Sequence, residues 1–331
     1  MRTTWDRERL LEMQRAFQGA CVLLAAAELD LFTVLGDRAM TARAIARKIA
    51  GDPRATAALA DALAAMRLLT KASGRYRAAD GVAEAMSDQK KGNVLAMAQH
   101  QANCLRRWAE LARVVRTGRP ARRVPSIRGE KADYASFVEA MDNVSAPMAG
   151  PLVARIKPGR FDHLLDVGGG SGSWTIAFLR ANPRARATIF DLPRVGPQAR
   201  ARIASAGLSD RVRFVGGDYT RDELPRGADL AWVSAIVHSL SGRQNRALFR
   251  KVRRALARGG RMLVRDILMD ESRTRPPSGA LFAINMLVGT EGGGTYTLDE
   301  LAADLKSAGF GRVRLVVRDE GMNSVVEAVR R

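Results

Sequence analysis

Three carboxylates follow three short apolar runs in the second half of the chain, and a glycine-rich turn accompanies the first. Asp166 begins the stretch DVGGGSG, Asp191 ends the next apolar run, and Asp218 follows the third. Each run has the length and composition of a buried strand. Because ligands bind at the carboxyl ends of parallel strands, we expect these three groups to share one site.

The glycine turn excludes two common nucleotide sites. No Lys-Ser/Thr pair follows the glycines, so the turn is not a P-loop. A dinucleotide fingerprint counted from Gly168 needs glycine where the chain has Ser173, and Asp166 would place a carboxylate beside the pyrophosphate. A ligand with a cationic amino-acid end tolerates or uses that carboxylate.

The other two carboxylates favour a nucleoside. Asp191 lies 21 residues after Gly170, where a carboxylate accepts two hydrogen bonds from a ribose diol, as it also does in NAD enzymes. Asp218, in the stretch GGDYT, is placed to accept from an adenine amino group, with Tyr219 beside the ring. One carboxylate at a strand end is often a helix N-cap, but three after successive strands favour ligand binding.

The elements that position these residues alternate between apolar runs and helical stretches, at a spacing of about 20 residues from position 161 onward. Such alternation predicts βαβ units, and the last run has no helix before it and is expected to enter antiparallel. The predicted fold class is α/β, with a Rossmann-like, mostly parallel seven-stranded sheet. The expected strands cover 163–167, 187–190, 212–215, 230–234, 262–264, 313–317 and 323–329.

The first third of the chain is expected to be helical. Thr41 is a predicted N-cap of one helix, and Asp52, followed by Pro53, begins a second that runs to about Leu69. A strand-like piece around Tyr76 follows. This is the layout of a winged helix, which often binds DNA.

A segment with two prolines and two glycines, residues 116–131, predicts a linker or exposed loop. Helix resumes over 134–156, with an expected break near Pro147 and Pro151. The expected domains are a winged-helix-like helical domain over 1–115, a linker and connecting helix over 116–158, and the α/β domain over 159–331.

Composition narrows the class of protein. Two cysteines exclude a disulfide scaffold, and the longest apolar run, Ala20 to Ala27, is too short to span a bilayer, so we expect a cytoplasmic protein with no membrane partner. The net charge of +20 invites a nucleic-acid partner. It splits into +10 on each side of Pro158, and 46 of the 54 basic residues are arginine, so the charge does not by itself predict nucleic-acid binding.

The second half resembles the class I S-adenosylmethionine-dependent O-methyltransferases that act on small molecules, such as caffeate, acetylserotonin and hydroxyneurosporene O-methyltransferases. The resemblance lies in LLDVGGGSGSWTIAFLRANPRARATIFDLPRV, GGDYT and SAIVHSL, and continues through ALFAINMLVGTEGGGTYTLDEL. It implies methyl transfer from S-adenosyl-L-methionine, with S-adenosyl-L-homocysteine as product. It also implies a homodimer formed by the N-terminal domain, without DNA binding.

By position, the resemblance implies a set of cofactor residues. These are Asp166, Gly168 and Gly170 at the methionine end, Asp191 and Leu192 at the ribose, Gly217, Asp218 and Tyr219 at the adenine, and Ser234 after the fourth strand. Ser234 stands where many relatives carry a cofactor-contacting lysine, so one contact is expected to be lost.

His238, just beyond the fourth strand, lies where the family keeps its general base. The acceptor must lose a proton as it attacks the methyl, and a neutral imidazole near pH 7 can take that proton. Asp266, at the end of the fifth strand, is the expected supporting acid. His163, at the opposite sheet edge, is expected to be structural, and His100 is left without a role.

The sequence departs from the family around this histidine. Relatives usually read His-Asp-Trp, whereas Ser239 and Leu240 follow here, and Thr295 replaces a glutamate that orients the imidazole. These departures leave open a C- or N-methyltransferase, or a non-methylating relative with the same cofactor pocket.

The resemblance also implies an acceptor pocket between the connecting helix and the sheet edge. Its candidate residues are Phe137, Met141, Asn285 and Met286. Such a pocket suits a flat aromatic, polyketide or carotenoid-like small molecule. No metal is expected, because no clustered His/Cys spacing is present. A distant alternative is a DNA-binding regulator with the winged helix as reader and the α/β domain as ligand sensor.

Overall fold

The computed structural model describes residues 5–90 and 92–331. The chain forms two compact units, one of Met1–Arg106 and Val124–Asn143, the other of Arg107–Arg123 and Val144–Arg331. The helix α9 (Glu130–Ile156) contributes to both. This division into two units does not test the domain boundaries expected at residues 115 and 158, which stay a prediction.

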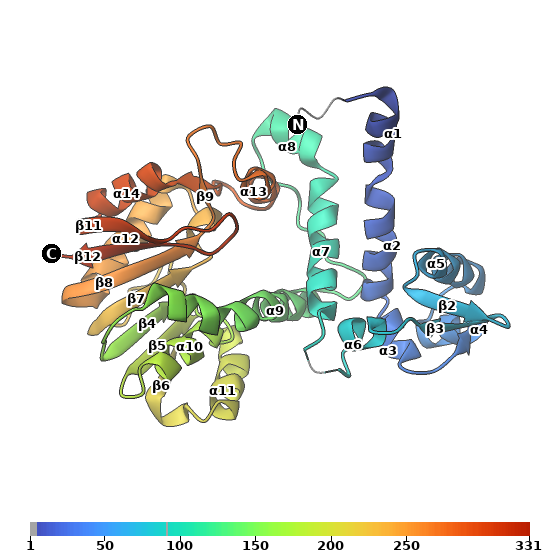
Figure 1. Cartoon of the computed structure of the whole chain (residues 1–331), viewed down its shortest axis with the longest axis horizontal. Helices are drawn as coiled ribbons and strands as arrows, with labels where there is room; N and C mark the ends of the chain where they lie inside the picture. The colour runs from blue at the N-terminus through green and yellow to red at the C-terminus, as the bar shows by residue number, and fades with distance from the viewer. Residues whose placement is uncertain (1–4, 91) are drawn as a thin grey trace. The chain divides into compact units, whose positions relative to one another are not determined.

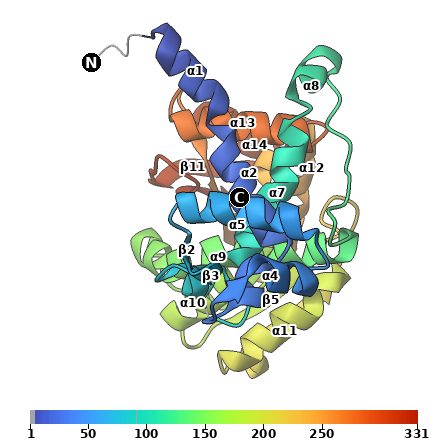
Figure 2. The ribbon, with the colours of Figure 1, turned by 90° about the vertical axis from the view of Figure 1, so that its right-hand side faces the viewer.

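The first unit is mostly helical and carries a small antiparallel sheet of order β1-β3-β2. In Figure 2, the helices α4 and α5 and the β2–β3 hairpin of this unit lie toward the viewer. Its apolar core includes Phe32, Ile45 and Leu63, all fully buried. Its elements are α1 (Arg7–Arg15), α2 (Phe17–Glu28), α3 (Leu31–Leu35), β1 (Met40–Thr41), α4 (Ala42–Lys48), α5 (Pro53–Ala65), β2 (Leu69–Ala72), β3 (Arg75–Ala78), α6 (Val82–Met86) and most of α7 (Leu95–Trp108).

The helix starts predicted here are confirmed. The side chains of Thr41 and Asp52 each accept a backbone N–H from the first turn of the helix that follows. The predicted end of the second helix at Leu69 was wrong. The helix ends at Ala65, because Arg67 adopts a left-handed conformation and the buried Leu69 begins β2.

The second unit contains a seven-stranded sheet of order β11-β12-β8-β7-β4-β5-β6. Its strands are β4 (His163–Val167), β5 (Arg186–Asp191), β6 (Val212–Gly216), β7 (Ala228–Ser234), β8 (Leu256–Asp266), β11 (Phe310–Val317) and β12 (Ser324–Arg330). The strands β4 to β8 pair in parallel, and β12 is antiparallel to both neighbours. The predicted α/β class and the antiparallel entry of the last strand are therefore confirmed.

Helices cover both faces of this sheet (Figure 1). One face packs against α12 (Gly242–Ala255) and α14 (Leu298–Ser307), the other against α10 (Ser173–Ala181), α11 (Gly196–Ser205) and the end of α9. The remaining elements are α8 (Leu111–Thr117), α13 (Pro277–Gly289) and the short parallel pair β9 (Leu268–Met269) and β10 (Tyr296–Thr297). In the described part of the chain, no helix is long and apolar enough to cross a membrane.

The predicted break in the connecting helix was wrong. The helix α9 runs through Pro147 and Pro151 without interruption. Each proline removes one N–H from the ladder, leaving the carbonyls of Asn143 and Pro147 without their usual helical partners. Both prolines are exposed, so water can bond these carbonyls and the helix continues.

Candidate active site

The glycine turn between β4 and α10 is shaped by its close neighbours. Gly168 has φ +64°, and its N–H donates to the carbonyl of Phe190 at 2.7 Å. A Cβ on Gly168 would lie 2.7 Å from Ile236 Cδ1, so a side chain there would both strain the backbone and clash. The backbone of the turn can thus lie close to a ligand.

The carboxylate of Asp166 lies beneath this turn. It is buried and accepts a hydrogen bond from Thr175 Oγ1 at 2.6 Å. Burial, with a smaller contribution from the nearby Asp191, raises the pKa of Asp166 to about 7. Near neutral pH this group is therefore poised between its neutral and ionised forms.

Asp191 joins the end of β5 to the glycine turn. Its two carboxylate oxygens accept the N–H of Gly170 at 2.8 Å and its neighbour Leu192's N–H at 2.6 Å. Burial raises its pKa above the ordinary range of a carboxyl group. A carboxylate has about four lone-pair positions, so two remain for a ligand diol.

Asp218 and Tyr219 complete this cluster. Asp218 accepts from the backbone N–H and hydroxyl of Thr220, and these bonds hold its pKa below the usual range. Burial, with Asp191 and Asp218 nearby, raises the pKa of Tyr219 to about 12, so its hydroxyl stays protonated. Tyr219 Cε1 lies 3.7 Å from the position of a Cβ on Gly168. The structure thus brings the predicted turn and adenine residues together.

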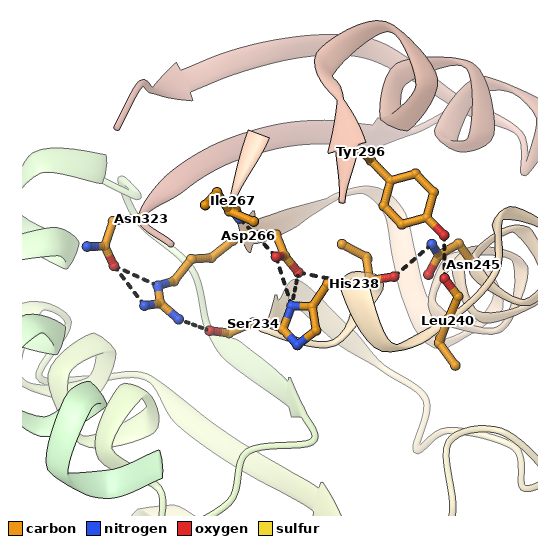
Figure 3. Close-up of polar contacts among 10 residues, drawn as sticks. Ser234, His238, Leu240, Asn245, Asp266, Ile267, Tyr296 and Asn323 are labelled. Carbon is orange, nitrogen blue, oxygen red and sulfur yellow. Dashed lines mark hydrogen bonds and ion pairs between the residues drawn. The ribbon is translucent and has the colours of Figure 1, made fainter. Parts of the chain in front are cut away.

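His238 lies in a 3-10 turn, Val237–Ser239, after β7. Its Nδ1 lies 2.9 and 3.0 Å from the two carboxylate oxygens of Asp266 (Figure 3). Asp266 is buried and also accepts the N–H of Ile267 at 2.8 Å. Because a carboxylate only accepts, Nδ1 carries the proton in the neutral ring, and Nε2 is left as the basic nitrogen.

Four further contacts hold the His238 turn, and none of them was predicted from the sequence. Gly294 N–H donates to the carbonyl of His238 at 2.8 Å. Asn245 Nδ2 and the hydroxyl of Tyr296 donate to carbonyls on either side of the histidine (Figure 3). The ring of Phe282 meets the imidazole edge to face, with centroids 4.8 Å apart. In the sequence, the run GGGTY at residues 292–296 was the signal that could have indicated the contacts of Gly294 and Tyr296.

Replacing Gly293 by alanine is expected to lower turnover about 10- to 100-fold, because small misplacements of a catalytic group are costly. A Cβ at Gly293 would lie 2.4 Å from the carbonyl oxygen of His238. A Cβ at Gly294 would have no non-adjacent atom of the described chain within 4 Å. Gly294→Ala is thus the matched control and should retain turnover. Steady-state kinetics with saturating cofactor checks both variants; equal rates for the two would contradict this account.

Thr295 occupies the position expected for a second orienting acid. It is buried, and its carbonyl accepts from Arg273. Within the described chain, the carboxylate that contacts the His238 imidazole is that of Asp266. His163 begins β4 at the opposite sheet edge, where its Nε2 lies 2.8 Å from Thr188 Oγ1.

The four predicted acceptor residues divide between the two units. Phe137 and Met141 belong to the first, where the Phe137 ring packs against His100 with centroids 5.2 Å apart. Asn285 and Met286 lie on α13 of the second, and Asn285 Oδ1 accepts from Trp108 Nε1 at 3.0 Å. An acceptor role for these residues stays a prediction. Among the described residues, no three His, Cys, Asp or Glu side chains are grouped as a metal site.

The family of the chain follows from comparison with known proteins. An O-methyltransferase domain matches residues 108–311, and an O-methyltransferase dimerisation domain matches residues 11–85. The chain therefore belongs to the O-methyltransferase family and is an S-adenosylmethionine-dependent O-methyltransferase.

Individual relatives share nearly the whole length of the chain. The tetracenomycin polyketide synthesis 8-O-methyl transferase TcmO of Streptomyces glaucescens is 33% identical over 313 residues, 92% of this chain and 91% of that protein. The 3-hydroxy-5-methyl-1-naphthoate 3-O-methyltransferase of Streptomyces sahachiroi is also 33% identical, over 93% and 91% of the two chains. The solved structure of PigF with SAH matches with a TM-score of 0.85, at 25% identity over 98% of this chain and all of that one.

Proposed function

We propose that the chain methylates a hydroxyl group of a small aromatic or polyketide-like molecule, with His238 as the general base. The observation that carries the proposal is the buried pairing of His238 Nδ1 with both carboxylate oxygens of Asp266. The relatives named for a polyketide and for a naphthoate support the acceptor class. Membership of the family favours this enzyme over a DNA-binding regulator.

The residues present fit the cofactor. The turn at Gly168 has no room for a side chain, which leaves backbone for a ligand to approach. Asp191 would hold the ribose with Leu192 behind it, and Asp218 and Tyr219 would hold the adenine. When bound, S-adenosylmethionine supplies a methyl group that its sulfonium has already activated.

The protein's part in the reaction is to position the acceptor and move one proton. His238 Nε2 would take the proton of the acceptor hydroxyl. The bound cofactor would supply the methyl group, whose bond to sulfur breaks as the bond to the acceptor oxygen forms, and neutral S-adenosylhomocysteine would be the leaving group. The imidazolium that results is stabilised by the Asp266 carboxylate on Nδ1, and it later returns the proton to solvent. Burial of this pair and the adjoining Phe282 ring limit the access of water.

The acceptor class is tested with matched aromatic compounds. A hydroxynaphthoate and the corresponding aminonaphthoate are incubated with the enzyme and S-adenosylmethionine, and release of S-adenosylhomocysteine is measured. Release with the hydroxyl compound alone is expected. Release with the amine alone would replace this proposal by N-methylation, the alternative that the departures at Ser239 and Thr295 leave open.

Cofactor binding is expected to release protons near pH 7. A cationic amino group close to Asp166 favours the ionised carboxylate, so it lowers a pKa that stands at about 7 without ligand. Affinity should therefore rise as the pH is raised through 7 and level off above it. Titration calorimetry at pH 7 in buffers of different ionisation enthalpy measures the release. Asp166→Asn is the control that abolishes it; an enthalpy independent of buffer in the unaltered protein would contradict the prediction.

We also propose that the chain forms a homodimer through its N-terminal unit. The match to a dimerisation domain supports this, and so does a row of exposed apolar side chains on α1 and the start of α2: Leu10, Leu11, Met13 and Phe17. Light scattering should give twice the mass of 35.9 kDa. Leu10→Glu with Leu11→Glu should give monomers, whereas Arg7→Glu on the same helix should not; a monomeric unaltered protein would refute the dimer.

A further inference from the structure

A buried arginine lies beside the expected cofactor site and, among the described residues, forms no ion pair with a carboxylate. Arg265, near the end of β8, is 5% exposed. Its Nε and Nη2 donate to Asn323 Oδ1 at 3.0 and 2.7 Å, and its Nη1 donates to Ser234 Oγ at 3.1 Å (Figure 3). Both acceptors are neutral. Burying a charge is costly unless it is paired, so this arrangement calls for an anion.

Two acids, Asp266 and Asp319, favour the charged form of Arg265 through space, but the hydrogen bonds of both are made to other groups. Asp266 holds the His238 imidazole, and Asp319 accepts the backbone N–H groups of Gly321 and Asn323. Within the described chain, neither forms an ion pair with Arg265. Burial lowers the pKa of Arg265 to about 10, so the guanidinium stays charged at neutral pH.

The guanidinium is held in one orientation next to the glycine turn. Its central carbon lies 4.7 Å from the centroid of the Trp174 ring, and Trp174 is the second residue of α10, directly after the turn. Stacking on an aromatic face together with the bonds to Asn323 and Ser234 fixes its plane. A guanidinium has five N–H donors, and the described bonds use three of them.

Sheet register places this cation at the same edge as the carboxylate under the turn. Asp166 on β4 pairs with Trp232 on β7, and Ser234, two residues further along β7, pairs with Arg265 on β8. Three neighbouring strands thus carry a carboxylate, a hydroxyl and a guanidinium across the edge where ligands bind in such sheets. This pattern is complementary to an amino acid, whose ammonium and carboxylate groups lie on one carbon atom.

We propose that Arg265 binds the α-carboxylate at the methionine end of the cofactor, with Ser234 and Asn323 as its positioning residues. The inference rests on the proposed cofactor site and adds to it the group that recognises the amino-acid end. Ser234 then contributes to the site through Arg265.

Two ligands that differ only in the carboxylate test this assignment. Calorimetry compares S-adenosylhomocysteine with its decarboxylated analogue, for the unaltered protein, Arg265→Met and Arg265→Lys. Arg265→Met is expected to weaken S-adenosylhomocysteine about 10- to 100-fold, the range for a charge-assisted hydrogen bond, and to leave the analogue's affinity unchanged. Arg265→Lys keeps the charge and should recover part of the loss.

The control is Arg261→Gln, on the same strand, whose guanidinium pairs with Glu327. It should bind both ligands as the unaltered protein does. The assignment is overturned if Arg265→Met loses affinity equally for both ligands, or loses affinity for neither. If Arg265→Met fails to fold, Arg265→Lys is used instead. The ratio of its affinity for S-adenosylhomocysteine to its affinity for the decarboxylated analogue is then compared with the same ratio in the unaltered protein. Equal ratios overturn the assignment of Arg265. Failure of the unaltered protein to bind S-adenosylhomocysteine would instead refute the cofactor site.

Discussion

Replacement of His238 by alanine is expected to lower kcat about 10²- to 10⁴-fold, the usual contribution of a positioned general base, without changing the affinity for S-adenosylhomocysteine. The proposed role of the imidazole is to act on the acceptor proton, whereas the proposed nucleoside contacts come from Asp191, Asp218 and Tyr219. Alanine also removes the ring that packs against Phe282, so added imidazole is expected to restore part of the rate.

The measurement is single-turnover methyl transfer, with calorimetry for the product nucleoside. His163→Gln is the matched control: this histidine lies at the opposite sheet edge and bonds Thr188, so its replacement should leave the rate unchanged. Asp266→Asn should lower kcat as well, because an amide does not stabilise the imidazolium. An unchanged rate in the His238→Ala variant would remove His238 as the base.

Asp191→Ala is expected to weaken S-adenosylmethionine about 10²- to 10³-fold, through the loss of two charge-assisted hydrogen bonds to the ribose. The same carboxylate holds Gly170 N–H, so alanine also loosens the glycine turn. Both effects act on cofactor binding, which makes this the largest binding loss expected at the site.

Titration calorimetry measures the loss, and Asp191→Asn separates its two causes. Asparagine retains an acceptor for the turn but carries no charge. The affinity of the Asp191→Asn variant for S-adenosylmethionine should therefore fall between those of the alanine variant and the unaltered protein. Asp210→Ala, which removes an exposed carboxylate from the same unit, should bind normally. Equal affinity in Asp191→Ala and the unaltered protein would exclude Asp191 from the cofactor site.

Local patterns predicted much of the fold. Alternating apolar runs identified the strands, and the Asp52-Pro53 step located a helix start, because each depends on neighbouring residues. The connecting helix was harder: Pro147 and Pro151 are breakers by type, but their exposure lets water bond the carbonyls they leave without partners. Exposure depends on tertiary packing, which one segment does not reveal.

The candidate site divides in the same way. Asp166, Asp191 and Asp218 were predictable as neighbours, because each lies at or just beyond the carboxyl end of a strand and parallel strands end at one edge. Arg265 was one of 46 arginines in the sequence, and only the register of β7 against β8 places it beside Ser234. Gly293 was equally hidden, since its restriction comes from a carbonyl 55 residues earlier in the chain.

The most direct test of the whole account is the location of the transferred methyl group. The enzyme is incubated with S-adenosyl-L-methionine labelled with ¹³C in the methyl group and a hydroxynaphthoate, and the product is analysed by mass spectrometry and NMR. One labelled methyl group on the hydroxyl oxygen is expected, with an equal amount of S-adenosylhomocysteine. A label on carbon or nitrogen, or S-adenosylhomocysteine formed without a methylated product, would contradict it.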